Sequence, residues 1–168
     1  HVVCLFSTLD AAMSFNRLVE TTLPPVENRP DIFGNQWIMD AEDRVIASVP
    51  LLLTTASSIS VDEVVQLARE YGGTAFPAHI DRPSYSVTAA LGDIPPVGFR
   101  AVEVTATGDV DALAAQYPEM RGKPLLLDSD AHYLENIQEA GPWLELPENT
   151  PEALIAALNG EFPAVWGR

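Results

Sequence analysis

Three residues of this chain have side chains suited to binding a metal ion. His79 follows the apolar segment 74–78, and Asp130 and His132 come soon after the apolar segment 124–127. An aspartate and a histidine two residues apart can reach one ion where the backbone turns sharply after a strand. Imidazole combined with carboxylate suits zinc, manganese or iron, whereas calcium and magnesium prefer oxygen ligands. We therefore predict that His79, Asp130 and His132 belong to one transition-metal site.

Other interpretations of these residues and their neighbours stay open at this point. Each histidine could be an ordinary polar residue at a strand end, and Asp128 could bind the metal, cap a turn or orient a ligand. Arg82 could hold a substrate phosphate through its planar guanidinium, or it could pair with Asp81 or face the solvent. Asp81 could also orient His79. Glu103 could point into a barrel or be a buried structural carboxylate.

The segments that must position these residues alternate between short apolar strands and helices. We expect strands at 1–6, 74–78, 99–105, 124–127 and 143–146, and helices at 9–19, 61 to about 72, 84–91, 110–115 and 151–158. This alternation favours parallel strands joined by crossovers, hence an α/β layered or barrel-like fold. In such folds the chemistry collects at the carboxyl ends of the strands.

One segment is predicted to leave this pattern. Residues 33–47 have the character of a β-hairpin that forms an excursion from the main body, and Pro24, Pro25 and Pro30 argue against regular structure before it. With 168 residues, 47% of them hydrophobic, the chain fits one globular domain. Trp37 and Trp143 are expected to be core residues, as is Phe99.

Composition sets limits on partners and compartment. The chain has 9 basic and 24 acidic residues and a formal net charge of -15, which argues against a sequence-independent grip on nucleic acid and makes nucleic acid an unlikely partner. Cys4, the single cysteine, has apolar neighbours and is predicted to be a buried thiol in a reducing compartment, which favours a cytoplasmic protein. No apolar run approaches the roughly 18 residues of a membrane span.

Two segments carry a family resemblance. They are GGTAFPAHIDRP (72–83) and LDSDAH (127–132), with FRAVEV (99–104) between them. Together they resemble the PHP (polymerase and histidinol phosphatase) family. By this resemblance His79 matches the isolated histidine of the third family motif, and Asp130 with His132 matches the Asp-x-His of the fourth. His1 matches a histidine of the second motif, or is simply a terminal residue.

The resemblance implies a metal-dependent phosphoester hydrolase. Members of the family resemble a distorted seven-stranded β/α barrel whose histidine and acidic ligands hold two or three metal ions. For this chain it implies an incomplete distorted (β/α)7-type barrel with mostly parallel strands and a β-hairpin insertion, which is the C-terminal part of the domain. The chain opens inside a strand, and the opening His-x-His and the bridging glutamate would precede His1. We expect a missing N-terminal segment or a second chain to complete the site.

The implied function and its alternative can now be stated. The ligands would be His1, His79, Asp130 and His132, the metal ions Zn, Mn or Fe, and Arg82 would bind the phosphate of a small phosphorylated metabolite or a nucleotide. The alternative is a non-catalytic regulatory or assembly module with a residual or structural metal site. An exonuclease domain like those of bacterial polymerases is a third reading, which the acidic composition weakens.

Overall fold

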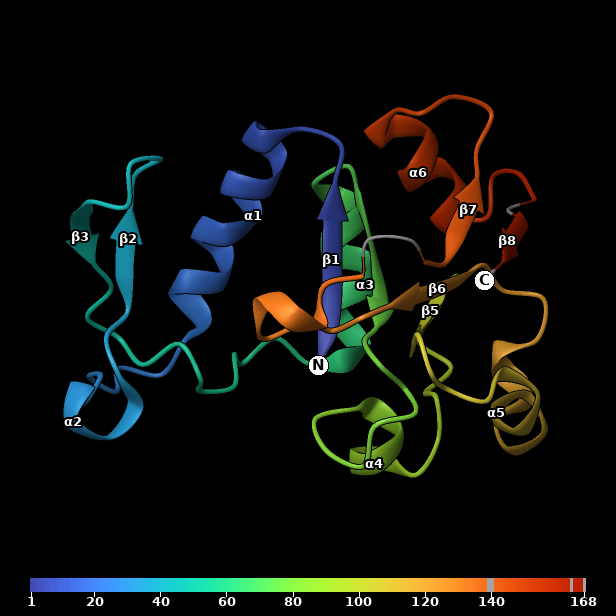
Figure 1. Ribbon diagram of the computed structural model, residues 1–168, viewed down its shortest axis with the longest axis horizontal. Helices are drawn as coiled ribbons and strands as arrows, with labels where there is room; N and C mark the ends of the chain where they lie inside the picture. The colour runs from blue at the N-terminus through green and yellow to red at the C-terminus, as the bar shows by residue number, and fades with distance from the viewer. Residues whose placement is uncertain (139–140, 164, 168) are drawn as a thin grey trace. The chain divides into compact units, whose positions relative to one another are not determined.

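The computed structural model describes residues 1–138, 141–163 and 165–167, and it divides the chain into two compact units (Figure 1). The first unit comprises residues 1–13 and 61–168, and the second comprises residues 14–60. The predicted hairpin lies inside the second unit, which is wider than the predicted excursion of residues 33–47. That the chain forms a single domain stays a prediction.

The first unit contains a mixture of strands and helices close to the predicted one. The elements are β1 (Val2–Phe6), the start of α1 (Leu9–Thr22), α3 (Val61–Glu70), β4 (Gly73–Pro77), α4 (Val87–Leu91), β5 (Val102–Thr105), α5 (Val110–Gln116), β6 (Leu125–Asp128), β7 (Trp143–Glu145), α6 (Pro151–Leu158) and β8 (Val165–Gly167). Short 3-10 helices lie at Pro118–Met120 and Leu134–Asn136. The strand β8 was not predicted, because three residues are too few to show the alternation of apolar and polar side chains that indicates a strand.

Local sequence explains where several of these helices begin. Thr150 caps α6 by accepting a hydrogen bond from the Ala153 N–H, and Pro151 occupies the first turn. Asp109 accepts in the same way from the Ala112 N–H at the start of α5. The predicted helices at 110–115 and 151–158 are therefore confirmed to within one residue.

Strand direction differs from the prediction. β5 and β6 are parallel, but β1 is antiparallel to β4 and β7 is antiparallel to β8. The expectation of mostly parallel strands is wrong for these pairs, because a helix between two strands permits a parallel return without imposing one. In the sequence, residues 14–60 of the second unit also separate β1 from β4. Over the residues that the structure describes, the strands form four two-stranded sheets and no closed barrel.

A hydrophobic cluster fixes the position of β4. Phe76 forms a buried cluster with Ala101 and Leu158, and Val3, Leu5, Leu126 and Leu154 pack against these three residues. Both α3 and α6 contact β1 and β4, and all five residues of β4 are buried. Burial of a side chain such as Phe76 contributes about 2–3 kcal/mol. The core therefore anchors the strand that ends next to His79.

The second unit contains the rest of α1, a short helix α2 (Pro30–Phe33) and the predicted hairpin. Its strands β2 (Trp37–Met39) and β3 (Val45–Ser48) are antiparallel, with an irregularity between Ile38 and Met39. The exclusion of regular structure at Pro30 is wrong, because proline suits the first turn of a helix and Pro30 begins α2. Every residue of β2 and β3 is exposed.

The expected core aromatic residues divide into two groups. Phe99 is buried, as predicted. Trp37 and Trp143 are each about half exposed, so their assignment to the core is wrong. Both lie in three-residue strands of two-stranded sheets, which bury less surface than β4 does.

None of the described helices is long and apolar enough to cross a bilayer.

Candidate metal and phosphoester site

The loops that follow β4, β5 and β6 meet at one polar pocket. The parallel register places Thr105 opposite Asp128, and the Ala106 N–H donates to the Asp128 carbonyl at 2.9 Å. The Ile80 N–H donates to the Glu103 carbonyl at 2.9 Å, which brings the end of β4 alongside β5. The pocket has a volume of about 800 Å³, and its lining includes Asp81, Arg82, Thr105, Ser129, Asp130, His132, Tyr133, Asn136 and Gln138.

His79 is buried beside this pocket in an unusual backbone conformation. Its φ is 29°, in the left-handed region that non-glycine residues rarely adopt. Its main-chain N–H donates to Oε1 of the buried Glu103 at 3.0 Å, which ties the turn to β5. The residue is 6% exposed, and the side-chain Nδ1 is buried with no hydrogen-bond partner. A strained turn and an unpartnered ring nitrogen are features of a ligand-binding position.

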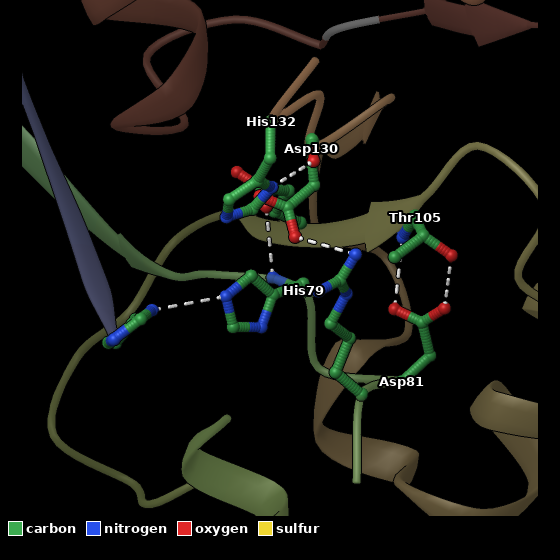
Figure 2. A network of polar contacts seen from close by, with 8 residues as sticks. His79, Asp81, Thr105, Asp130 and His132 are labelled. Atoms are coloured by element: carbon green, nitrogen blue, oxygen red, sulfur yellow. Dashed lines mark hydrogen bonds and ion pairs between the residues drawn. The ribbon is translucent and has the colours of Figure 1, made fainter. Parts of the chain in front are cut away.

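His1 lies next to His79 because β1 and β4 are antiparallel. The register pairs Val2 with Pro77, so the start of β1 meets the end of β4, whereas a parallel pair would have placed it near Gly73. The Nδ1 atom of His1 is 3.3 Å from the Nε2 atom of His79 (Figure 2). The His1 ring also stacks on Tyr85, with ring centroids 5.1 Å apart.

The geometry of the two histidines can be compared with that of a metal site. Two nitrogen ligands at 2.0–2.1 Å from a tetrahedral zinc ion would be about 3.3–3.4 Å apart. The 3.3 Å between His1 Nδ1 and His79 Nε2 fits two positions on one ion as well as it fits a hydrogen bond. Within the described part of the chain, however, no group of three or more His, Cys, Asp or Glu side chains is placed to hold one ion.

Asp130 and His132 line the pocket, whereas His1 and His79 are not among its lining residues. Asp130 has a φ of 48°, so the sharp turn expected after the strand is present. Nδ1 of the exposed His132 is 2.8 Å from the Asp130 carbonyl oxygen, which can only accept (Figure 2). In a neutral ring this contact assigns the proton to Nδ1 and leaves the Nε2 lone pair available to a ligand, as in many metal-binding histidines.

The charged neighbours pair differently from the alternatives considered above. Nη2 of Arg82 is 3.0 Å from Oδ2 of Asp130, so Arg82 neither pairs with Asp81 nor simply faces the solvent. The alignment of this ion pair is not that of a hydrogen bond, since Asp130 Oδ2 is buried without a hydrogen-bond partner. Asp81 accepts from both the N–H (2.9 Å) and the hydroxyl (2.5 Å) of Thr105. The hydrogen bonds described for the Asp81 carboxylate therefore link it to the end of β5, and none of them orients His79.

Negative charge accumulates around the pocket. Burial raises the pKa of Glu103 to about 7, the His79 N–H opposes this shift, and the charges of Asp128, Asp130 and Asp81 add to it. The pKa of Asp128 is raised by burial and by the charge of Asp130. A cation bound here would relieve this mutual repulsion. The donor set of imidazole nitrogens and carboxylate oxygens thus fits a transition metal in chemistry and in local charge.

Several features of the site carry no clear sequence signal. Tyr85, with a φ of 61°, stacks on His1, and Tyr133, Asn136 and Gln138 line the pocket. No spacing rule distinguishes such residues from ordinary loop residues. The sequence left two possibilities for Glu103, a side chain that points into a barrel or a buried structural carboxylate. In the structure its buried carboxylate accepts the hydrogen bond from the His79 N–H.

Comparison with known proteins yields a similarity of fold. No family model matches the chain, and no curated protein matches it. Among solved structures, the chain is similar to PfuEndoQ, a novel lesion-specific endonuclease from Pyrococcus furiosus, with a TM-score of 0.63 and 19% sequence identity. The match covers 99% of this chain and 37% of that chain, so this chain spans little more than a third of the length of that protein.

This similarity corrects one prediction. Nucleic acid was expected to be an unlikely partner because of the net charge of -15. A protein that contains the same fold is an endonuclease, so that prediction is contradicted. Net charge describes the whole surface and sets long-range attraction, whereas a cleavage site needs only local contacts with one phosphodiester.

Proposed function

We propose that this chain is part of a metal-dependent phosphoester hydrolase with a PHP-like fold. The observation that carries the proposal is the 3.3 Å separation of His1 Nδ1 and His79 Nε2 at the edge of a polar, acid-rich region. The match of fold to an endonuclease supports the hydrolase class. Because the match covers only 37% of that chain, the activity of the whole protein is also a proposal.

Each residue has a role in this proposal. His1, His79, Asp130 and His132 are the ligands that this chain contributes to zinc, manganese or iron, with two or three ions in the completed site. Bound metal ions supply a Lewis acid and an activated water for attack on phosphorus. Arg82 holds a phosphate oxygen through its guanidinium. A side-chain nucleophile is not required.

Two residues act by positioning others. Glu103 fixes the main chain of His79 through the 3.0 Å hydrogen bond from its N–H. Asp81 ties the loop after β4 to Thr105 at the end of β5. Together these contacts hold His79 and Arg82 in the loop that connects β4 to α4. The loop therefore carries a metal ligand and a phosphate-binding cation three residues apart.

For the substrate we propose a phosphodiester of a nucleic-acid strand. The endonuclease of similar fold supports this choice over the small phosphorylated metabolite or free nucleotide that the resemblance implied. A pocket of about 800 Å³ is large enough for one nucleotide unit. Tyr133, Asn136 and Gln138 in its lining offer a stacking surface and amide groups for the sugar or base.

The test combines metal analysis with hydrolysis. The protein is incubated with Zn²⁺, Mn²⁺ or Fe²⁺, its bound metal is measured by mass spectrometry, and cleavage of a labelled oligonucleotide is compared with hydrolysis of p-nitrophenyl phosphate. His79→Ala and Asp130→Ala should each lower bound metal and reduce cleavage at least about 100-fold. Glu148→Gln, in an exposed loop outside the site, is the matched control and should retain both. A wild-type protein that binds none of the three metals would contradict the proposal.

A non-catalytic module remains the second candidate. It is favoured by the finding that no group of three ligands is assembled over residues 1–138, 141–163 and 165–167. Stoichiometric metal without cleavage of either substrate would support this candidate. Cleavage of p-nitrophenyl phosphate alone would return the substrate to a small phosphorylated compound.

A further inference from the structure

Arg82 and Asp130 form an ion pair between two groups that the proposed function assigns to different ligands. Nη2 of Arg82 lies 3.0 Å from Oδ2 of Asp130, and Figure 2 shows the contact between the loops that follow β4 and β6. The Asp130 side chain is 22% exposed and the Arg82 side chain is 42% exposed. Both residues line the pocket, and the pair is partly exposed to it although Oδ2 of Asp130 itself is buried.

Among the described pocket residues, Arg82 is the cation that can bind the substrate phosphate. It is the one lysine or arginine among the described residues that line the pocket. Its own main-chain N–H donates to the His79 carbonyl at 2.9 Å, which anchors the backbone, while the side chain is 42% exposed and paired only through its guanidinium. The neighbouring carboxylate of Asp81 is already occupied by Thr105. Asp130 is therefore the described acidic group that holds the Arg82 guanidinium.

The two proposed ligands cannot be held independently. A divalent ion at Asp130 would stand close to the guanidinium, and like charges at such distances repel strongly in a partly buried site. A guanidinium neutralised by a carboxylate is in turn a poor binder of phosphate, because its charge is already paired. Binding of the metal to Asp130 and binding of the phosphate to Arg82 therefore both require this ion pair to open.

We infer that the metal and the substrate phosphate bind in order, with Arg82 exchanging its partner between them. Without metal, Arg82 occupies Asp130. Metal at Asp130 displaces the guanidinium, which then binds an oxygen of the phosphate group. This inference rests on the proposed function, since it takes Asp130 as a metal ligand. It goes beyond that function by making phosphate binding through Arg82 conditional on the metal.

Metal affinity is the first test, because it needs no activity measurement. Mn²⁺ binding is followed by electron paramagnetic resonance in wild type, Arg82→Gln, Arg82→Lys and the control Glu148→Gln. Arg82→Gln removes the competing cation and should bind Mn²⁺ about 10-fold more tightly than wild type. Arg82→Lys keeps the charge and should stay within about 3-fold. An Arg82→Gln protein that binds Mn²⁺ no more tightly than wild type overturns the inference.

Phosphate binding without metal is the second test. Inorganic phosphate is titrated by calorimetry into protein kept in chelator. Asp130→Asn removes the carboxylate charge that holds Arg82, so it should bind phosphate about 10-fold more tightly than wild type. The double variant Arg82→Gln/Asp130→Asn should lose this gain. No gain in a folded Asp130→Asn protein also overturns the inference, and if circular dichroism shows that this variant is unfolded, the Mn²⁺ titration of Arg82→Gln decides.

The two proposals can fail separately. If wild type binds no metal, the proposed function and the binding order fail together. If wild type binds Mn²⁺ but Arg82→Gln binds it equally well, the order fails while the proposed function stands.

Discussion

Glu103 combines a positioning contact with an unfavourable charge. It accepts the His79 N–H from a buried position, and its pKa is raised to about 7, mainly by burial. In the unfolded chain the pKa is near 4.5, so between pH 4.5 and 7 the folded state binds more protons than the unfolded state. The stability that this group contributes is fully present below about pH 4.5. It is lost as pH rises through 7.

Glu103→Gln should therefore stabilise the metal-free protein at neutral and higher pH. The amide oxygen keeps the hydrogen bond from His79, and the charge is gone. We expect a gain of about 1 kcal/mol in the free energy of unfolding at pH 8, after allowance for solvent screening, and no gain near pH 4.5. Urea unfolding in chelator at the two pH values measures it, with Glu148→Gln as control. A variant less stable than wild type at pH 8 would show that the carboxylate is needed ionised.

Cys4 gives a prediction on reactivity. Burial in β1 raises the pKa of its thiol to about 11, two units above the ordinary value of 9.0. Because the thiolate is the reactive form, the reaction with a disulfide reagent at pH 8 should be about 100-fold slower in the native protein than in urea. The control is free cysteine under both conditions. Equal native and denatured rates would place the thiol in open solvent.

At the scale of elements, the pairing of β1 with β4 decides which residues meet. The antiparallel register brings His1 to His79, and the core around Phe76 holds β4 in place. Gly73 is the close contact in this pair: a Cβ there would lie 2.4 Å from the Leu5 carbonyl oxygen and 2.5 Å from the Phe6 ring. A side chain at this position must push β1 away.

Gly73→Ala should consequently weaken metal binding from a distance. We expect a loss of about 1–3 kcal/mol in the free energy of unfolding and a clear loss of Mn²⁺ affinity, because β1 carries His1. Gly122→Ala is the control: with a φ of 75° and no atom within 4 Å, it costs about 1–2 kcal/mol of local strain only. Both variants lose stability, but only Gly73→Ala should lose affinity for Mn²⁺. Equal Mn²⁺ affinities of the two variants would show that the β1–β4 register does not affect the metal site.

For the whole molecule, sequence patterns predicted local structure better than assembly. The caps and stripes that define α5 and α6 are contained in a few adjacent residues, so their bounds were predictable. The direction of β1 and the exposure of Trp37 depend on contacts between distant segments, which periodicity does not encode. The same limit applies to the site. The sharp turn at Asp130 was predictable, but its pairing with Arg82 was not.

The charge of the whole molecule makes a last prediction about the proposed nucleic-acid substrate. A protein with a net charge of -15 cannot rely on many phosphate contacts, and Arg82 is the one lysine or arginine among the described residues of the pocket lining. The affinity for a single-stranded oligonucleotide should then fall with salt with a logarithmic slope of about -1, where one contact contributes roughly -0.7.

Fluorescence anisotropy between about 50 and 200 mM salt at fixed Mn²⁺ measures this slope. Arg82→Gln should make the slope shallower by about 0.7, whereas the control Glu148→Gln should leave it unchanged. A wild-type slope steeper than about -4 would mean that an extended cationic surface outside this pocket binds the strand. The recognition of nucleic acid would then be a property of that surface, and the pocket would supply only the chemistry.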